Sequence, residues 1–358
     1  MSTITAVSTH RLTTPLHTPF VTALRHTTTT DTVVVTITDS DGVTGWGEAP
    51  QVWQVTGESL AGADAAISGP LRAAVLGRDT DDLVSVCRAV AGTVVRNFGA
   101  KAAVDVAMHD LAARRRGVSL PVFLGSTTHR VPTDVTVAAG DAAAVARSAA
   151  DRAAAGFDVL KMKVGTDAAG DVARVRAVRD AVGDDVRLRL DANQGWTPRE
   201  AVQVICALED AGVHVELVEQ PVAAADLDGL AWVTSRVNTA VMADESVFGV
   251  RDLVEVIRRR AADMVNVKLA KCGGLTAART LLDLARAHGL GTMVGSMMET
   301  HIGVGAAASL VAAYGTTAVC DLDAAWWAAT SPVIGGLVYD QATVVLPSGP
   351  GLGIEGLA

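Results

Sequence analysis

From residue 131 onward the chain repeats one unit, a short apolar strand followed by a helix rich in Ala, Arg and Asp, and this repeat constrains the fold more than any other feature. The eight candidate strands cover residues 131–137, 159–164, 186–191, 216–220, 241–245, 264–269, 292–296 and 318–323. Near-continuous apolar strands separated by single helices indicate parallel pairing, and eight of them favour a closed barrel over an open sheet. We therefore predict an α/β fold, a modified (β/α)8 barrel of the TIM type.

A polar or charged residue ends almost every one of these strands, at a steady distance from the one before. The intervals are 24 to 28 residues, the length of one strand and one helix, between positions 163, 191, 219, 244, 268, 296 and 321. All of these side chains should therefore lie at the C-terminal rim of successive strands, where barrel enzymes hold their active sites. The repeat predicts one site built from residues that are far apart in the sequence.

The chain has a different character on either side of the barrel. Strand patterns occur at residues 4–11 and 32–38, and helical patterns occur around residues 58–75, 80–91 and 99–116. We expect residues 1–125 to form an α+β domain and residues 126–325 to form the barrel. Residues 326–358 are expected to return to the first domain, with a hairpin between Gly335 and Leu346.

Composition limits the function classes. The chain of 358 residues has a net charge of −9, which gives no basic surface for nucleic acid or for an anionic membrane. Its four cysteines are scattered without a C-x-x-C pair, and the N-terminus lacks the features of a signal peptide, so we expect a cytoplasmic protein. The uncharged tract from Ile302 to Cys320 contains three glycines and is expected to form a buried helix and strand rather than a membrane span. A small molecule is the expected partner.

The second barrel strand holds two of the five lysines in the chain, Lys161 and Lys163, whereas the other 25 of the 30 basic residues are arginines. Side chains two apart on a strand point to the same side, so the two ammonium groups should lie side by side. Each charge is expected to lower the pKa of the other, which would make one of them a proton acceptor near neutral pH. A guanidinium could not take that role. The alternative is an exposed strand face with solvated charges.

Three consecutive strands end in a carboxylate, at Asp191, Glu219 and Asp244. Three such groups at one point would repel one another unless a hard divalent cation joined them, so we predict a site for Mg²⁺, with Mn²⁺ as a possible substitute. The alternative is that each carboxylate caps the helix that follows it. Three in succession, between strands that carry lysines, make this alternative weak.

Lys163 and Lys268 lie on the strands that bracket the three acidic ones. Around a closed barrel these two positions face each other across the mouth, so a substrate held on the metal would have one lysine on each side. This geometry suits the removal of a proton from one face of a carbon and its return to the other. The carbon would be α to a carboxylate, where the metal stabilises the enediolate. Lys161 is expected to stabilise charge rather than act as a base.

Asp321 and Asp323 are the only charged residues between Ile302 and Tyr339. They point to the same side of the last strand, and buried like charges need a cation. Because this segment contains no lysine or arginine, we predict that an ammonium group of the substrate supplies the positive charge. The alternative is a strand-end pair that caps irregular backbone.

These motifs together resemble those of the enolase superfamily, in its muconate-lactonizing-enzyme subgroup, and most closely those of dipeptide epimerases of the L-Ala-D/L-Glu type. The resemblance spans essentially the whole chain and rests on Gly45–Glu48, which is similar to the capping-domain motif, and on Lys161, Lys163, Asp191, Glu219, Asp244 and Lys268, which are similar to the catalytic set. It implies a barrel of the (β/α)7β type and an α+β capping domain made of the N-terminal part and the C-terminal tail. It also implies Mg²⁺ as the cofactor and a homo-oligomer.

The same resemblance implies the substrate contacts. Asp321 and Asp323, together with the segment that contains Met297 and Met298, resemble the dipeptide epimerase signature, in which the aspartates bind the α-ammonium group. Arg25 matches the capping-loop arginine that meets the substrate's side-chain carboxylate in Ala-Glu epimerases. Two tryptophans at 326 and 327 depart from the expected smaller residues. They either shape the pocket for an apolar or aromatic side chain or pack the junction between barrel and cap.

We therefore expect a Mg²⁺-dependent isomerase that inverts the α-carbon of the C-terminal residue of a dipeptide, such as L-Ala-D/L-Glu, by two-base proton transfer through an enediolate. A muconate cycloisomerase or an o-succinylbenzoate synthase would share the lysines and the metal ligands, so these reactions are the alternative within the superfamily. A non-catalytic ligand-binding barrel is the alternative from another class.

Overall fold

Seven parallel strands form the sheet that positions the site. In the computed structural model, which describes residues 2–358, they pair in sequence order from first to last, as expected when every crossover turns in the same direction. The strands are β5 (Val135–Val137), β6 (Val159–Lys163), β7 (Arg187–Asp191), β8 (Val215–Glu219), β9 (Ala240–Ala243), β10 (Met264–Lys268) and β11 (Gly291–Gly295). The predicted barrel fold is confirmed.

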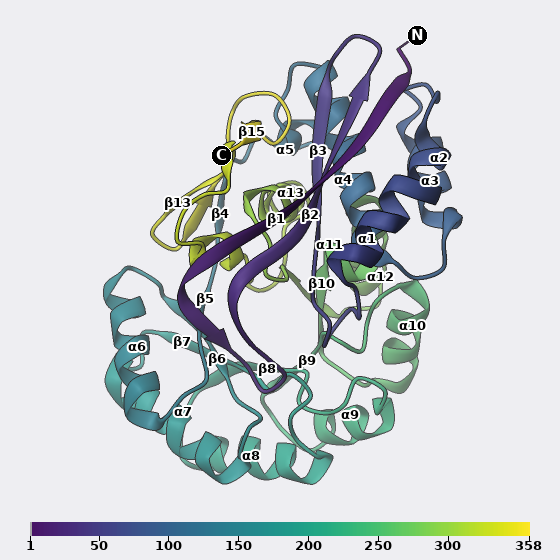
Figure 1. Cartoon of the computed structure of the whole chain (residues 1–358). Coiled ribbons are helices and arrows are strands. Elements are labelled where there is room, and N and C mark those ends of the chain that lie inside the picture. The colour runs from purple at the N-terminus through teal and green to yellow at the C-terminus, as the bar shows by residue number, and fades with distance from the viewer. Residues whose placement is uncertain (1) are drawn as a thin grey trace.

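Helices cover the outside of this sheet, and those labelled α6 to α10 form an outer arc in Figure 1. They are α6 (Ala142–Ala154), α7 (Ala168–Val182), α8 (Pro198–Asp210), α9 (Leu227–Thr234), α10 (Val250–Arg259), the short α11 (Leu269–Cys272), α12 (Leu275–Ala287) and α13 (His301–Tyr314). Several begin at residues that favour helix starts, such as Thr197, which forms a capping box with Glu200 at the start of α8. Their apolar sides and the strands share one large core.

The eighth predicted strand, at residues 318–323, does not form a regular strand. The barrel closes instead through two single parallel bridges, from Cys320 to Thr133 and from Asp321 to Gly295. The backbone N–H of Leu322 donates to the side-chain oxygen of Thr133 at 3.0 Å. This N–H group therefore bonds to a side chain and not to the backbone of a neighbouring strand. The first predicted strand is also divided, into β4 (Arg130–Pro132) and β5, which belong to different sheets.

The N-terminal part forms the cap above the barrel in Figure 1. Its antiparallel sheet contains β1 (Ile4–Val21), β2 (His26–Asp39) and β3 (Thr44–Pro50), and its helical elements are α1 (Leu60–Ala66), η1 (Ile67–Leu71), α2 (Arg72–Val75), α3 (Leu83–Thr93), α4 (Phe98–Arg115) and α5 (Leu120–Phe123). Strand β3 packs so closely on α4 that a Cβ atom at Gly45 or Gly47 would lie within 2.1 Å of a helix carbonyl oxygen. The two glycines of the Gly45–Glu48 motif therefore permit this close contact.

Strands β1 and β2 are longer than predicted and form a hairpin that extends from the cap to the barrel mouth (Figure 1). The predicted strands at residues 4–11 and 32–38 are only the distal halves of this hairpin. Its turn carries Arg25, and the end of β1 carries Phe20, so a loop of the cap contributes to the site of the barrel.

The C-terminal segment returns to the first domain as predicted, but it does not join the β1–β3 sheet. Its strands are β12 (Val333–Gly335), β13 (Val338–Asp340), β14 (Thr343–Val345) and β15 (Ile354–Leu357). The β13–β14 hairpin pairs with β4, and Gly351 forms a parallel bridge with Ser119 of the cap. Asp110 in α4 accepts a hydrogen bond from the backbone N–H of Leu352 at 2.6 Å.

Among residues 2–358, no helix combines the length and the apolar character needed to cross a bilayer. The uncharged tract that begins at Ile302 forms the buried helix α13, as predicted.

Candidate active site

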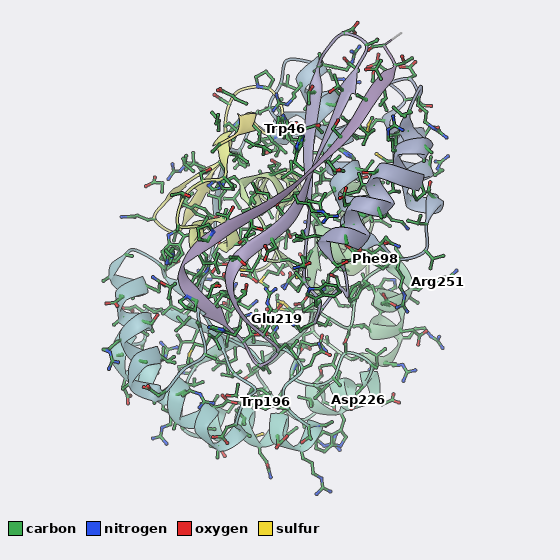
Figure 2. The ribbon with its side chains drawn as sticks, in the orientation of Figure 1. Trp46, Phe98, Trp196, Glu219, Asp226 and Arg251 are labelled. Atoms are coloured by element: carbon green, nitrogen blue, oxygen red, sulfur yellow. The ribbon has the colours of Figure 1, made fainter. Side chains whose placement is uncertain are left out.

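The charged residues that end the barrel strands meet at one place. Each is at most 8% exposed, and Figure 2 shows Glu219 in the middle of the molecule, beside the part of the β1–β2 hairpin that reaches the barrel. The residues are Lys161 and Lys163 on β6, Asp191 on β7, Glu219 on β8, Asp244 after β9, Lys268 on β10, and Asp321 and Asp323 after α13. The strand register places Lys163, Asp191 and Glu219 at the same level of the sheet, because each is the direct neighbour of the next.

Two lysines join the three carboxylates into one cluster. Lys161 Nζ lies 3.0 Å from Asp191 Oδ2 and 2.8 Å from Glu219 Oε2. Lys268 Nζ lies 2.8 Å from Asp244 Oδ2 and 3.8 Å from Glu219 Oε1. Glu219 is therefore within reach of both lysines and lies between the other two carboxylates.

The donor set of this cluster fits Mg²⁺. Glu219 Oε2 and Asp244 Oδ1 are buried, and the partner that each has within residues 2–358 is a lysine ammonium group, of Lys161 and Lys271 respectively. Buried acceptors of this kind are destabilising unless a cation or a donor compensates them. Carboxylate oxygens on three adjacent strands are the ligands that a hard divalent cation prefers.

Lys163 and Lys268 lie four strand positions apart in the sheet, with β7, β8 and β9 between them. Four positions in a barrel of eight correspond to opposite sides of the mouth. Both lysines line the same cavity, where Lys163 Nζ donates to Asp191 Oδ2 at 2.7 Å and Lys268 Nζ donates to Asp244 Oδ2 at 2.8 Å. A small molecule in this cavity has one ammonium group on each side.

The predicted lowering of the pKa is wrong for Lys161. Burial acts to lower its pKa, but Asp191, Asp321 and Glu219 outweigh burial and raise the pKa well above the usual value. Burial likewise acts to lower the pKa of Lys268, and Asp244 is the main charge that raises it above its usual value. The prediction failed because carboxylates on other segments of the barrel, far away in the sequence, affect Lys161 more than the lysine two residues away.

The prediction that the aspartate pair has no cation of its own is wrong for Asp321. Lys161 Nζ donates to Asp321 Oδ2 at 2.7 Å. Asp323 differs, because its Oδ2 accepts from two uncharged donors, the backbone N–H of Thr136 at 2.7 Å and Nε1 of Trp327 at 2.9 Å. Of the two aspartates, only Asp323 forms no ion pair within residues 2–358.

A cavity of about 50 Å³ lies between the cap and these residues. Its wall includes Phe20, Leu24 and Arg25 from the β1–β2 hairpin, Val55 from the loop after β3, Met297 and Met298 after β11, and Lys163, Asp244, Lys268, Asp321 and Asp323 from the barrel. Burial lowers the pKa of Arg25 to about 10, and no carboxylate of the described chain raises it. The cavity wall therefore contains an arginine and an aspartate, neither of which has a charged partner.

Sequence reasoning missed two polar residues of this wall, Asn193 and Glu245. Asn193 Nδ2 donates to Glu245 Oε1 at 3.2 Å, while Asn193 Oδ1 and Glu245 Oε2 are buried without a hydrogen bond. Burial, together with the charge of Asp244, raises the pKa of Glu245 to about 8. Their positions in the sequence could have indicated this role, because Glu245 directly follows Asp244 and Asn193 lies two residues after Asp191.

Lys271 is a fourth buried lysine of this cluster, and no role was predicted for it from the sequence. Its Nζ donates to the backbone oxygens of Val247 at 3.1 Å, of Asn266 at 3.2 Å and of Asp244, and it also faces the Asp244 carboxylate. It therefore links the segment after β9 to strand β10 and holds Asp244 between two lysines.

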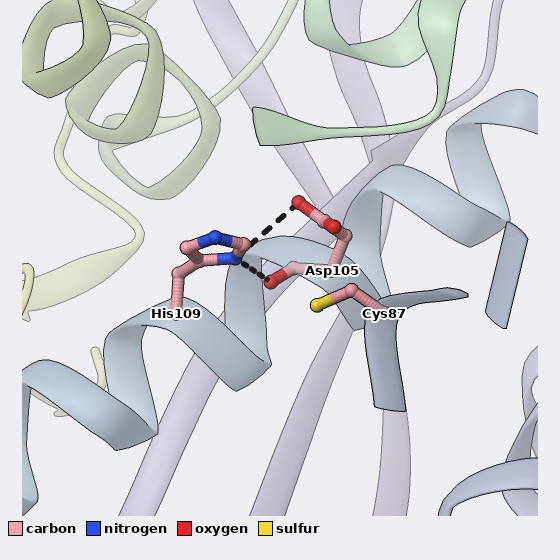
Figure 3. Close-up of side chains that lie close together, drawn as sticks. All are labelled: Cys87, Asp105 and His109. Carbon is pink, nitrogen blue, oxygen red and sulfur yellow. Dashed lines mark hydrogen bonds and ion pairs between the residues drawn. The ribbon is translucent and has the colours of Figure 1, made fainter. Parts of the chain in front are cut away.

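A second group of metal-binding side chains lies in the cap, at Cys87, Asp105 and His109 (Figure 3). Their ligand atoms all lie within 4.8 Å of one another, and no other group of three within residues 2–358 meets that spacing. The facing atoms of Asp105 and His109 already have uncharged hydrogen-bond partners, however. Both carboxylate oxygens of Asp105 accept hydrogen bonds from Thr276, and His109 Nδ1 lies 2.8 Å from the backbone oxygen of Asp105.

Fold and site together define a class of protein. A capped barrel with acidic residues on three central strands and a lysine on either side has the architecture of the enolase superfamily. Residues 144–356 match the enolase C-terminal domain-like family, and residues 4–125 match the N-terminal domain of the mandelate racemase and muconate lactonizing enzyme family. The chain belongs to this family, and the resemblance predicted from the motifs is confirmed.

Two relatives are similar over nearly the whole chain. The L-Ala-D/L-Glu epimerase of Bacillus subtilis is 42% identical over 99% of this chain and 97% of its own length. The hydrophobic dipeptide epimerase of Enterococcus faecalis is 39% identical over 94% of this chain and 95% of its own length.

Solved structures agree with these sequence relationships. The substrate-liganded complex of the L-Ala-D/L-Glu epimerase from Bacillus subtilis has a TM-score of 0.97 and covers 99% of both chains at 42% identity. The Enterococcus faecalis dipeptide epimerase complexed with Mg and the dipeptide L-Leu-L-Tyr has a TM-score of 0.94, at 38% identity over 98% of this chain and 99% of that chain.

Proposed function

We propose that this protein is a Mg²⁺-dependent dipeptide epimerase, an isomerase that inverts the α-carbon of the C-terminal residue of its substrate. The single observation that carries the proposal is the placement of Lys163 and Lys268 on opposite sides of one cavity, with the carboxylate cluster between them. Relatives that are 39% to 42% identical over nearly their full length are dipeptide epimerases, which supports it.

Asp191, Glu219 and Asp244 would hold the Mg²⁺, and Mn²⁺ would be able to replace it because it accepts the same oxygen ligands. When bound, the metal would stabilise the negative charge that develops on the substrate carboxylate, and it would offset the charge of Asp244 that raises the pKa of Lys268. Lys161, which contacts Asp191, Glu219 and Asp321, would keep these carboxylates together rather than exchange a proton with substrate.

Lys163 and Lys268 would divide the proton transfer between them. One lysine, in its neutral form, takes the α-proton from the face of the substrate that it meets, and the other, as an ammonium group, delivers a proton to the opposite face. Their roles reverse for the other epimer. Lys163 is 8% exposed and Lys268 is 6% exposed. Because both side chains are buried, few water molecules compete for these protons.

Asp323 and Arg25 would select the substrate. Asp323, next to Asp321, would receive the α-ammonium group of the dipeptide, since it has no cation of its own. Arg25 would receive an acidic side chain, so we propose L-Ala-D/L-Glu or a related dipeptide rather than an apolar one. Met297 and Met298 would supply the apolar part of the wall.

We also propose that the protein is cytoplasmic and assembles as a homo-oligomer. All four cysteines are free thiols within the described chain, which agrees with a reducing compartment. Large apolar side chains such as Val84 and Val95, which are 70% and 86% exposed, are available for contact with another copy.

Exchange in D₂O tests the function. Wild-type protein with Mg²⁺ and L-Ala-L-Glu should replace the α-hydrogen of the glutamate with deuterium and produce both epimers, as followed by NMR. Lys163→Ala and Lys268→Ala should each slow epimerisation by at least about a thousandfold, with any remaining exchange confined to one epimer. Lys101→Arg, outside the cavity, is the matched control and should behave as wild type. Full exchange of both epimers in both alanine variants would contradict the proposal.

A further inference from the structure

The two tryptophans that depart from the expected pattern lie in η2 (Ala324–Trp327), directly after the aspartate pair. Neither lines the cavity, so they do not contact a ligand there, and both pack at the junction of barrel and cap. They differ in burial: Trp327 is 1% exposed and Trp326 is only partly buried. Burial of the complete indole of Trp327 next to a binding residue requires a partner for its N–H group.

That partner is Asp323. Nε1 of Trp327 donates to Asp323 Oδ2 at 2.9 Å, and the backbone N–H of Thr136 donates to the same oxygen at 2.7 Å. No side-chain hydrogen bond within residues 2–358 uses Asp323 Oδ1, and Asp323 lines the cavity. Two donors thus fix one oxygen, and the other oxygen is left for a ligand.

The partners of Asp323 differ in charge from the partner of Asp321. Asp321 is held by the charged Lys161, which neutralises it. Asp323 is held only by uncharged N–H groups, which orient the carboxylate without cancelling its charge. Its orientation therefore depends on Trp327 and on one backbone group that no side-chain substitution can remove.

The ring of Trp327 also supports the opposite wall of the cavity. It makes an edge-to-face contact with Phe20 at a centroid distance of 5.2 Å and a stacked contact with His17 at 5.4 Å, and both residues lie on β1 of the cap. Phe20 lines the cavity, and Lys163 Nζ lies 5.7 Å from its ring. Met298 belongs to the same buried cluster as Phe20 and Trp327.

Trp326 lies at the partly buried edge of the same cluster, and its indole forms no hydrogen bond with Asp323 within residues 2–358. Its ring lies under the guanidinium of Arg152 at 4.4 Å and meets the edge of His17 at 4.7 Å. The neighbouring tryptophan is therefore a matched control, with the same residue type, the same short helix and no side-chain bond to the Asp323 carboxylate.

We propose that Trp327 is a positioning residue for the substrate: its indole N–H orients Asp323 toward the α-ammonium group of the dipeptide, and its ring holds Phe20 against the reacting region. The proposal rests on the proposed function, because it assigns Asp323 to the ammonium group. It makes the junction between cap and barrel part of substrate recognition.

Steady-state kinetics of Trp327→Phe and Trp326→Phe with L-Ala-L-Glu test this role. Trp327→Phe keeps an aromatic ring but removes the donor to a charged acceptor, so KM should rise about tenfold while kcat stays within about twofold of wild type. Trp326→Phe should leave both within about twofold. Equal KM values in the two variants, or a fall in kcat at unchanged KM, would overturn the proposal.

A second substitution at position 327 separates the loss of the N–H group from an effect on folding. 3-Benzothienylalanine at position 327 keeps two fused rings and lacks the N–H group, so it should raise KM by the same factor without changing the thermal unfolding midpoint. A wild-type KM with this residue would show that only packing matters and would overturn the role of the N–H. Failure of the proposed function is separately visible, since wild-type protein would then epimerise no dipeptide at all.

Discussion

Two groups of buried metal-binding side chains lie in this molecule, and the more compact one is the less suited to a metal. Cys87, Asp105 and His109 in the cap have their ligand atoms within 4.8 Å of one another. The carboxylates at the barrel mouth are spaced more widely, with lysine ammonium groups between them. What separates the two groups is the kind of partner that their carboxylate oxygens have: backbone and hydroxyl donors in the cap, and mainly lysine ammonium groups at the barrel mouth.

In the cap, hydrogen bonds satisfy the acceptors. Asp105 bonds Thr276 at the start of α12 with both oxygens, and a Cβ at Gly274 would lie 2.5 Å from the Asp105 side chain, so cap and barrel fit tightly there. At the barrel mouth, buried oxygens of Glu219 and Asp244 have lysine ammonium groups as their partners. Buried carboxylate oxygens that only cations compensate are typical of a binding site, whereas a cluster satisfied by uncharged donors is typical of a structural contact.

The largest expected effect comes from the barrel mouth. Glu219→Gln should lower kcat/KM by at least about a thousandfold and abolish Mg²⁺ binding, because it removes a charged ligand from the centre of the cluster. The measurement is epimerisation over a range of Mg²⁺ concentrations. A variant that regained wild-type activity at high Mg²⁺ would show that Glu219 only tunes the affinity.

A third acidic group, the pair Glu48 and Glu299, sharpens the comparison, because neither carboxylate forms an ion pair with a lysine or arginine within residues 2–358. Glu48 Oε1 accepts from the backbone N–H groups of Thr300 at 2.8 Å and Gly303 at 2.6 Å at the start of α13. Glu299 Oε1 accepts from the backbone N–H of Met297 at 2.8 Å. Burial, with the charge of Glu48, raises the pKa of Glu299 to about 8 from its usual 4.5.

The sign of the resulting pH dependence follows from this shift. Between pH 4.5 and about 8 the unfolded chain has lost the proton of Glu299 while the folded chain keeps it, so the free energy of unfolding falls as the pH rises. We expect a contribution on the order of 5 kcal/mol across this window, fully present below it and lost above it. Urea unfolding of Glu299→Gln should show a flatter pH profile than wild type, and an unchanged profile would contradict the assignment.

Asp105→Asn is expected to act on stability and not on the metal. The substitution weakens the bonds that hold the start of α12, so the free energy of unfolding should fall by about 1 to 2 kcal/mol in urea. Mg²⁺ affinity should match wild type. A loss of Mg²⁺ binding in this variant would break the distinction between the two clusters.

The smallest effect is expected for Cys87→Ser. Burial raises the pKa of the Cys87 thiol far above its usual value, and a hydroxyl of similar size can still donate to Asp105. The free energy of unfolding should change by less than about 1 kcal/mol, and mass spectrometry should find no bound Zn²⁺ in either protein. Stoichiometric Zn²⁺ that is lost on substitution would make the cap cluster a metal site.

The sequence was most informative where the geometry of the fold is regular. The strand-helix repeat and the alternation within strands predicted that Asp191, Glu219, Asp244 and Lys268 reach one rim, because parallel strands end at the same edge. These relations need no knowledge of loops or of contacts between distant strands.

Pairings across the barrel could not be predicted in the same way. Alternation indicates that Lys161 and Asp321 both face inward, but it does not say that they meet, since 160 positions separate them and several carboxylates compete for one lysine. The irregular closure near Leu322 and the bond from Trp327 to Asp323 depend on single side-chain contacts, which no periodic pattern encodes.

Calorimetric titration with Mg²⁺ tests the central claim most directly, in wild type, in Asp244→Asn and in Cys87→Ser. We predict one Mg²⁺ per chain in wild type and in Cys87→Ser, and no binding in Asp244→Asn. Undiminished binding in Asp244→Asn, or binding that disappears in Cys87→Ser, would contradict the account.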